Sequence, residues 1–138
     1  MRDKAIFLDT NILVYAHDRD AGAKHTTARR RVGELWEGDR PPSISVQVLQ
    51  ELYVNLLRKR VPAKEARQTV TDYLEWHVVD NDRDLLMAGI EEHERWKLSF
   101  WDGLILAAAR RAGADVIWSE DLNPGQSLDG LVVVNPLA

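Results

Sequence analysis

The sequence predicts an α/β fold in which a short central parallel sheet is flanked by helices on both faces. Short apolar segments of strand character alternate along the chain with longer segments of helical periodicity. We assign no β-hairpin turn between neighbouring strands, so we expect the strands to be connected through helices. Both features are typical of parallel sheets that are buried on their two faces.

The expected strands are brief, and the expected helices fill the chain between them. The strands are expected at Ala5–Leu8, Ser43–Ser45, His77–Val79 and Val116–Trp118, with a last one in LVVVNP near the end of the chain. The helices are expected at residues 12–15, Ala23–Glu37, 46–60, 62–76, Asp82–Trp96 and 102–112.

Glycine and proline residues mark the boundaries of these helices. Gly38 and the Pro41-Pro42 pair close the second helix, and Gly113 closes the last one, whose Ala and Leu content favours a helix. Pro62 separates the third helix from the fourth and suits a first helical turn. The chain therefore reads as alternating units without a linker or a repeat.

The composition points to a single cytoplasmic domain, expected to span residues 1–138. Cysteine is absent, which excludes disulfides and thiolate metal sites, and no apolar segment approaches the ~18 residues that a membrane helix needs. We therefore expect a soluble protein with no membrane partner. The net charge of −4 excludes an overall basic surface, although arginines cluster at residues 29–31 and 58–60.

Four carboxylates are expected near one edge of the sheet. Asp9 follows the first strand and Asp121 follows the strand at residues 116–118, so both lie where the carboxyl ends of parallel strands meet. Glu51 lies in the first turns of the helix after Ser43–Ser45, and Asp102 is expected to begin the last helix.

Each of these acids also has a plainer explanation. Asp9 and Asp102 could each cap a helix. Asp121 stands among turn-forming residues and could be an ordinary loop acid. Glu51 points away from the leucines of its helix, as a solvated glutamate also does. Only the combination of the four favours a functional site.

A cluster of carboxylates predicts a cation-binding site. Carboxylates held close together raise each other's pKa unless a cation neutralises them. Oxygen ligands select hard cations, and Mg²⁺ is usually held by one or two carboxylates while it keeps waters for a substrate phosphate. Such a site suits hydrolysis of phosphodiester bonds, because the ion activates water and stabilises charge on the phosphate oxygens.

Four short motifs occur in the order found in a known family. They are LDTN at Leu8–Asn11, VLQEL around Glu51, SFWDGLILAAA around Asp102 and SEDL at Ser119–Leu122. In motif order and in length the chain resembles the PIN-domain ribonucleases, in particular the VapC-type toxins of toxin–antitoxin pairs. The resemblance implies a PIN-like three-layer fold and an endoribonuclease that depends on Mg²⁺ or Mn²⁺.

The resemblance also implies roles for individual residues. The implied catalytic residues are Asp9, Glu51, Asp102 and Asp121. Asp9 and Asp102 would bind the metal directly, and Asp121 would bind it directly or through a water. Glu51 would hold a metal-bound water or act as a base.

Two neighbouring polar residues match supporting positions of the family. Asn11 and Ser119 would orient the acids through side-chain hydrogen bonds, unless they only form turns. Glu120 is adjacent in sequence but does not match the acidic position, so it is not part of the predicted site.

The resemblance further implies an RNA substrate, a small antitoxin and a homodimer, with cleavage that leaves a 5′-phosphate and a 3′-hydroxyl. One alternative is a PIN scaffold that has lost activity and serves as a binding module. Another is a receiver-like signalling module that binds Mg²⁺. The complete set of acids counts against the first, and the lack of adjacent acids near the first strand counts against the second.

The tryptophans and the arginine clusters each have two possible roles. We expect Trp36, Trp101 and Trp118 to be mostly core or interface anchors, with base stacking as the alternative. We expect Arg29–Arg31 to form a solvated helix face, with phosphate binding as the alternative.

Overall fold

One six-stranded sheet forms the centre of the protein, whose computed structural model describes residues 4–123 and 125–138. The strands, in the order in which they lie side by side, are β3 (His77–Val79), β2 (Ser43–Ser45), β1 (Ile6–Leu8), β4 (Val116–Trp118), β6 (Leu131–Val134) and β5 (Ser127–Leu128). Every neighbouring pair is parallel except β5 with β6. The carboxyl ends of β1, β2 and β4 therefore lie along one edge.

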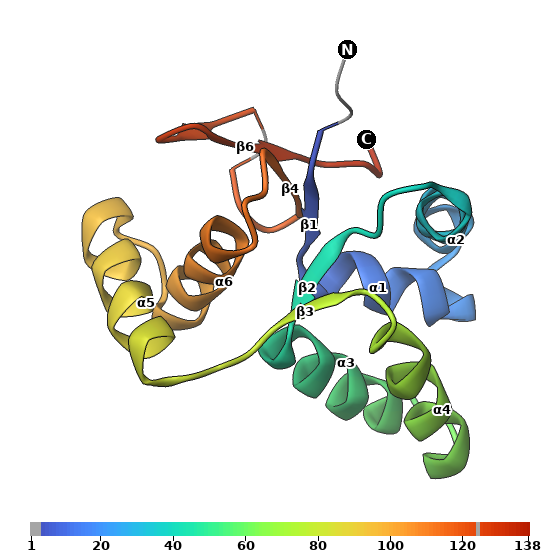
Figure 1. The fold of residues 1–138 in the computed structure, drawn as a ribbon. Coiled ribbons are helices and arrows are strands. Elements are labelled where there is room, and N and C mark those ends of the chain that lie inside the picture. The colour runs from blue at the N-terminus through green and yellow to red at the C-terminus, as the bar shows by residue number, and fades with distance from the viewer. Residues whose placement is uncertain (1–3, 124) are drawn as a thin grey trace.

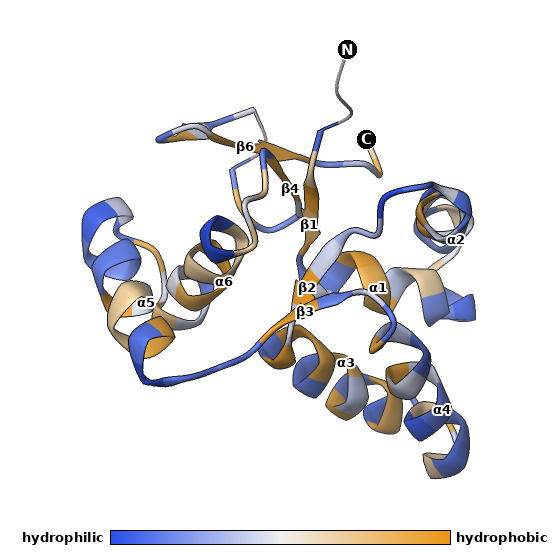
Figure 2. Cartoon of the chain, viewed as in Figure 1, coloured by the Kyte–Doolittle hydropathy of each residue, from blue (hydrophilic) through white to orange (hydrophobic). Residues whose placement is uncertain are grey.

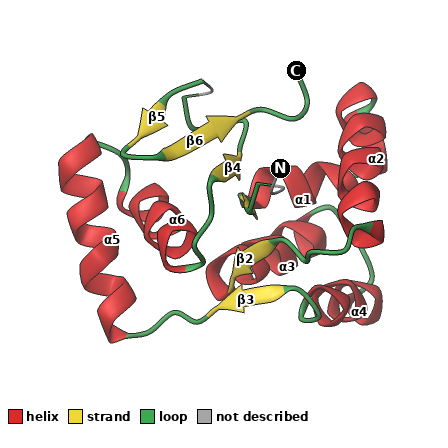
Figure 3. Ribbon diagram, turned by 45° about the horizontal axis from the view of Figure 1, so that its top comes forward, coloured by secondary structure: helices red, strands yellow, loops and turns green. Residues whose placement is uncertain are grey.

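Six α-helices in the described part of the chain cover this sheet from two sides. They are α1 (Thr10–His17), α2 (Ala23–Glu37), α3 (Val46–Arg58), α4 (Ala63–Tyr73), α5 (Arg83–Trp96) and α6 (Phe100–Arg111), with a short 3₁₀ helix at Arg19–Ala21. In Figure 1 and Figure 3, α5 and α6 lie on one side of the sheet and α1 to α4 on the other. The predicted α/β class and its covered parallel sheet are confirmed. Among the described residues, no helix is both long and apolar enough to cross a membrane.

Apolar side chains fill the space between the sheet and the helices. Figure 2 shows β1 in hydrophobic colours, whereas much of α4 and α5 is hydrophilic. Phe7, Ile44 and Ile117, from three neighbouring strands, have no exposed surface. Helix α6 is buried from Gly103 to Ala109. Because the strands are buried on both faces, the acids that follow them emerge at the edge of the sheet.

The last two strands form a β-hairpin, so the expectation that no hairpin occurs is wrong here. Leu128 of β5 lies opposite Leu131 of β6 in an antiparallel pair. Asp129 and Gly130 between them have φ angles of 55° and 88°, and a type I′ turn needs positive φ at both positions. Asp-Gly is a preferred sequence for this turn. The signal was therefore present, but β5 is too short for its strand to be recognised.

Helix α6 begins at Phe100, two residues before the expected start at Asp102. Ser99 is its N-cap, and the Ser99 hydroxyl accepts the backbone N–H of Asp102 at 3.1 Å. Asp102 is therefore not the cap of its helix. The next residue, Gly103, allows α5 and α6 to pack closely, because a Cβ atom there would lie 2.5 Å from the backbone oxygen of Gly89.

Candidate active site

The carboxyl edge of the sheet carries the four predicted acids. Asp9 directly follows β1, and Asp121 follows β4 after two intervening residues. Glu51 lies on α3, and Asp102 lies in the first turn of α6. The four side chains come from segments far apart in the sequence, yet they all line one cleft of about 370 Å³.

The cleft has further polar and aromatic walls. Besides the acids it is lined by Thr10, Asn11, Val14, Tyr15, Gln47, Asn55, Lys59, Trp101 and Ile105. Sequence reasoning did not assign Thr10, Gln47, Asn55 or Lys59 to the site. Asn55 on α3 and Lys59 at its C-cap follow Glu51 at intervals of four residues, and this spacing was the available signal for both.

Asp9 is the most buried of the four acids, with 6% of its surface exposed. One carboxylate oxygen accepts the backbone N–H of Thr10 at 2.7 Å, so Asp9 caps α1 while it faces the cleft. The other oxygen accepts the hydroxyl of Ser119 at 2.8 Å and the amide of Asn11 at 3.4 Å. A carboxylate offers about four acceptor positions, so these donors leave about one for a further partner.

Asn11 and Ser119 connect Asp9 to Asp121. The Asn11 amide also donates to the Asp121 carboxylate at 3.1 Å, and its oxygen accepts the backbone N–H of Glu120 at 3.2 Å. The Ser119 hydroxyl accepts the backbone N–H of Asp121 at 3.2 Å. The two residues therefore form the turn and contact the acids at the same time.

Glu51 is held in the cleft by two hydrogen bonds. The Thr10 hydroxyl donates to the Glu51 carboxylate at 2.7 Å, and the Asn55 amide donates to the Glu51 backbone oxygen at 2.8 Å. Glu51 is therefore not a freely solvated glutamate. Thr10 and Glu51 are 41 positions apart, and only the folded chain shows that they meet.

Burial and mutual repulsion make two of the acids harder to ionise. Burial raises the pKa of Asp9 to about 6, and the charges of Asp102 and Glu51 act in the same direction, whereas the hydrogen bonds from Ser119 and Thr10 oppose the shift. Burial also raises the pKa of Asp102, to which the Asp121 carboxylate contributes. A cation in the cleft would relieve this repulsion.

The donors in the cleft suit a hard cation that keeps water ligands. They are oxygen atoms of carboxylates, which Mg²⁺ and Mn²⁺ prefer. Across residues 4–123 and 125–138, no three histidine, aspartate or glutamate side chains are placed to hold one metal ion together. Mg²⁺ is usually held by only one or two carboxylates, so Asp9, with its open acceptor position, and Asp102 fit such an ion.

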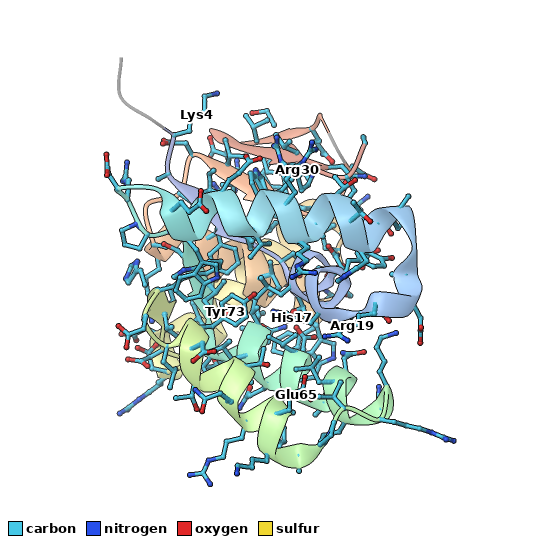
Figure 4. The ribbon with its side chains drawn as sticks, turned by 90° about the vertical axis from the view of Figure 1, so that its right-hand side faces the viewer. Lys4, His17, Arg19, Arg30, Glu65 and Tyr73 are labelled. Carbon is cyan, nitrogen blue, oxygen red and sulfur yellow. The ribbon has the colours of Figure 1, made fainter. Side chains whose placement is uncertain are left out.

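Glu120 and the arginine run lie outside the cleft. The Glu120 carboxylate accepts the hydroxyl of Tyr15 at 2.9 Å and forms an ion pair with Lys24 at 2.9 Å. Arg29 lines a separate hollow between α2 and α4. In Figure 4, Arg30 lies on the side of α2 away from that hollow. Arg29–Arg31 is therefore not part of the wall around the acids.

Comparisons with solved structures find similar folds. The chain is similar to VapC20 from Mycobacterium tuberculosis, described as a sarcin-ricin loop cleaving toxin, with 25% identity, a TM-score of 0.65 and coverage of 86% of this chain and 92% of that one. It is also similar to a toxin–antitoxin complex from Klebsiella pneumoniae (20% identity, TM-score 0.69, coverage of 96% and 97%). A third is VapBC2 from Rickettsia felis bound to a promoter DNA fragment (18% identity, TM-score 0.65, coverage of 94% and 96%).

The sequence itself carries the family assignment. No protein with a curated description matches it. The PIN domain family matches residues 6–125, a range that contains all four acids and both supporting residues. Because this match covers most of the chain, and the fold agrees with it, the protein belongs to the PIN domain family.

Proposed function

We propose that this protein is a metal-dependent endoribonuclease that acts as the toxin of a toxin–antitoxin pair. The observation that carries the proposal is the meeting of Asp9, Glu51, Asp102 and Asp121 in one cleft. Family membership and the likeness to a toxin that cleaves the sarcin-ricin loop support RNA as the substrate.

The chemistry follows from the donors in the cleft. Asp9 and Asp102, with Asp121 directly or through a water, would hold Mg²⁺ or Mn²⁺. The bound ion would supply charge neutralisation at the phosphate and a lower pKa for water. Glu51, held by the Thr10 hydroxyl, would accept a proton from the attacking water.

The reaction breaks one bond and forms another. Water oxygen bonds to phosphorus, and the bond from phosphorus to the 3′-oxygen breaks. The 3′-oxygen gains a proton, so the products are a 5′-phosphate and a 3′-hydroxyl. Ser119 and Asn11 would keep Asp9 and Asp121 in place during this step, since their hydrogen bonds fix both carboxylates.

Incubation of the purified protein with structured RNA tests the activity. We expect cleavage with Mg²⁺ or Mn²⁺ and none with EDTA, and end-labelling should detect 5′-phosphates on the products. Cleavage that continues undiminished in EDTA would refute metal dependence. Soluble, folded protein that leaves all RNA intact with either ion would favour the inactive-scaffold alternative.

We also propose a small antitoxin as partner, a homodimer as the assembly and the cytoplasm as the location. The similar structures that contain toxin–antitoxin complexes support the partner. Expression of this chain alone should arrest the growth of a host cell. Co-expression of a short reading frame immediately upstream, encoding a DNA-binding protein, should relieve the arrest. Unaffected growth in the presence of folded protein would contradict the toxin role.

The receiver-like alternative is not favoured. A receiver-like module needs adjacent acids after the first strand, whereas Asp9 is followed there by Thr10 and Asn11. The inactive scaffold is not favoured either, because all four acids are present and lie together.

A further inference from the structure

The cleft extends beyond the acids along α3. Glu51, Asn55 and Lys59 line it at intervals of four residues, and eight residues correspond to about 12 Å of helix. The Lys59 ammonium group is 2.8 Å from the carboxylate of Asp18, and the Lys59 side chain is 40% exposed. One end of the cleft is therefore acidic, and an ammonium group lines it further along.

Trp101 forms the wall of the cleft next to Asp102. The residue is 60% exposed, the largest fraction among the exposed large apolar residues described. Its backbone oxygen accepts the amide of the buried Gln47 at 3.2 Å. Its ring meets that of Phe100 edge-on, with 5.0 Å between centroids. The backbone of Trp101 is thus held by Gln47 and its ring contacts Phe100, while most of the residue stays open to solvent.

Trp36, Trp76 and Trp118 behave as anchors. Trp76 and Trp118 are buried. Trp36 is 42% exposed, but its ring lies 4.9 Å from Trp76 and 5.5 Å from Tyr73 between centroids. These three fit the role of core or interface anchors. Trp101 differs, because it combines high exposure with a place beside the acids.

We propose that Trp101 and Lys59 position the RNA strand in this cleft, on the two sides of the acids. The scissile phosphate would lie at the acids, a neighbouring base would stack on Trp101, and a phosphate further along would bind Lys59. Stacking on an aromatic ring and contact of phosphates with basic side chains are the interactions by which proteins hold single strands. Bases within a duplex are already stacked, so a base can stack on Trp101 only where it is unpaired.

This inference rests on the proposed ribonuclease activity, and abasic substrates test it. We expect Trp101→Ala to lower kcat/KM on a short unpaired RNA by roughly 5- to 150-fold, the loss of one base–aromatic stack. On the same RNA with an abasic nucleotide at the stacked position, Trp101→Ala should change kcat/KM less than twofold. Trp101→Phe should recover most of the activity. If Trp101→Ala lost as much activity on every abasic RNA as on the intact RNA, or lost none on the intact RNA, the stacking role would be overturned.

RNA binding supplies a second readout that does not need cleavage. In an Asp9→Asn background with Mg²⁺, binding of a short unpaired RNA should quench tryptophan fluorescence. The added change Trp101→Phe should remove the quench, whereas Trp36→Phe, at an exposed tryptophan outside the cleft, should keep it. Lys59→Gln should reduce the slope of log affinity against log salt by about 0.7, the value for one phosphate contact on a single strand. A slope unchanged in Lys59→Gln would remove Lys59 from the path.

The two proposals can fail separately. Trp101-dependent quenching without cleavage by the unmodified protein would retain the strand path and refute the nuclease. Cleavage that is unaltered in Trp101→Ala would retain the nuclease and refute the strand path. Oligomeric state should be the same in Trp101→Ala and in the unmodified protein. A change from dimer to monomer, with unchanged RNA binding per chain, would identify Trp101 as a contact between chains and overturn the proposal.

Discussion

Two hollows in this molecule have nearly the same volume and different chemistry. The acid cleft measures about 370 Å³, and the hollow between α2 and α4 measures about 380 Å³. Figure 4 shows His17, Arg19 and Tyr73 between these two helices, with Glu65 on α4. Carboxylates dominate the first hollow, whereas histidine, arginine and aromatic side chains dominate the second.

The buried groups of the second hollow satisfy one another. The His17 ring lies 2.7 Å from the Tyr73 hydroxyl, and Tyr73 packs against Trp36 and Trp76 with centroids 5.5 Å and 4.8 Å away. The acids of the first hollow are hydrogen-bonded, yet the charges of Asp102 and Glu51 still raise the pKa of Asp9, and the charge of Asp121 raises the pKa of Asp102. The contrast indicates that the second hollow serves stability, while the first holds charge that a bound partner would have to neutralise.

The largest expected effect is on catalysis and separates the two hollows. Asp9→Asn and Asp102→Asn should each lower RNA cleavage at saturating Mg²⁺ by about 100-fold or more, because each removes a charged group at the reacting phosphate. His17→Gln, in the other hollow, should leave the rate unchanged. Asp121→Asn should cause a smaller loss that Mn²⁺ partly restores. Near-normal turnover in Asp9→Asn or Asp102→Asn would show that the residue is structural.

The second largest effect is on how the free energy of unfolding depends on pH. The Asp9 pKa of about 6 in the folded protein lies above the ordinary value of 3.8, so folding favours the protonated form. The stability contributed by Asp9 is therefore present below pH 4 and is lost as the pH rises through about 6. Without metal, this loss amounts to about 3 kcal/mol.

Asp9→Asn isolates this contribution. In EDTA, the free energy of unfolding of Asp9→Asn relative to the unmodified protein should rise by up to about 3 kcal/mol between pH 4 and pH 7. Denaturant titrations at several pH values measure the difference. A difference that is independent of pH would mean that Asp9 does not titrate in this range.

The third effect tests whether the acids share a cation. Saturating Mg²⁺ or Mn²⁺ at 100 times the dissociation constant should stabilise the fold by about 2.7 kcal/mol. Asp102→Asn should melt higher than the unmodified protein in EDTA, because it relieves repulsion, and should gain less from added metal. Asp72→Asn, on the exposed face of α4, should show neither change. An Asp102→Asn variant that melts lower in EDTA and responds normally to metal would argue against a shared site.

The smallest effect comes from the hollow between α2 and α4 and has the opposite sign. Burial, assisted by the charges of His25 and Arg29, lowers the pKa of His17 below its ordinary value of 6.5. Folding therefore favours neutral His17, and its contribution to stability is present above pH 6.5 and lost on acidification. Melting curves of His17→Gln should lack this acid-dependent part, while the lost contact with Tyr73 costs about 1 kcal/mol at neutral pH. If the melting temperatures of His17→Gln and of the unmodified protein depended on pH in the same way, this contribution of His17 would be refuted.

Much of the fold was readable from local pattern, and the exceptions have physical reasons. Strands β1, β4 and β6 are short apolar runs in the sequence, whereas β2 and β3 each include polar residues. The hairpin at Ser127–Val134 was missed although Asp129-Gly130 is a turn signal, because a two-residue strand has too few residues to show a pattern. The start of α6 was misplaced because Ser99, three residues before Asp102, was not recognised as its cap.

The site residues that follow a strand were predictable, because the end of the strand determines where they lie. Asp9 and Asp121 follow from the rule that parallel strands end at a common edge. The Thr10–Glu51 hydrogen bond could not be predicted in this way, since it depends on the angle at which α1 packs against α3. The open position of Trp101 likewise depends on how closely α6 packs against α5, and Gly103 and Gly89 allow this close packing.

Three of the helices begin at the acid cleft, and this arrangement changes the electrostatic potential in the cleft. Helix α1 begins immediately after Asp9, α3 begins five residues before Glu51, and α6 begins two residues before Asp102. Each helix start carries a partial positive charge of roughly half an elementary charge from its aligned peptide dipoles. The potential felt by an approaching phosphodiester is therefore less negative than the carboxylates alone would produce. The backbone itself thus lowers the electrostatic barrier that would otherwise keep a polyanion away from a cluster of acids.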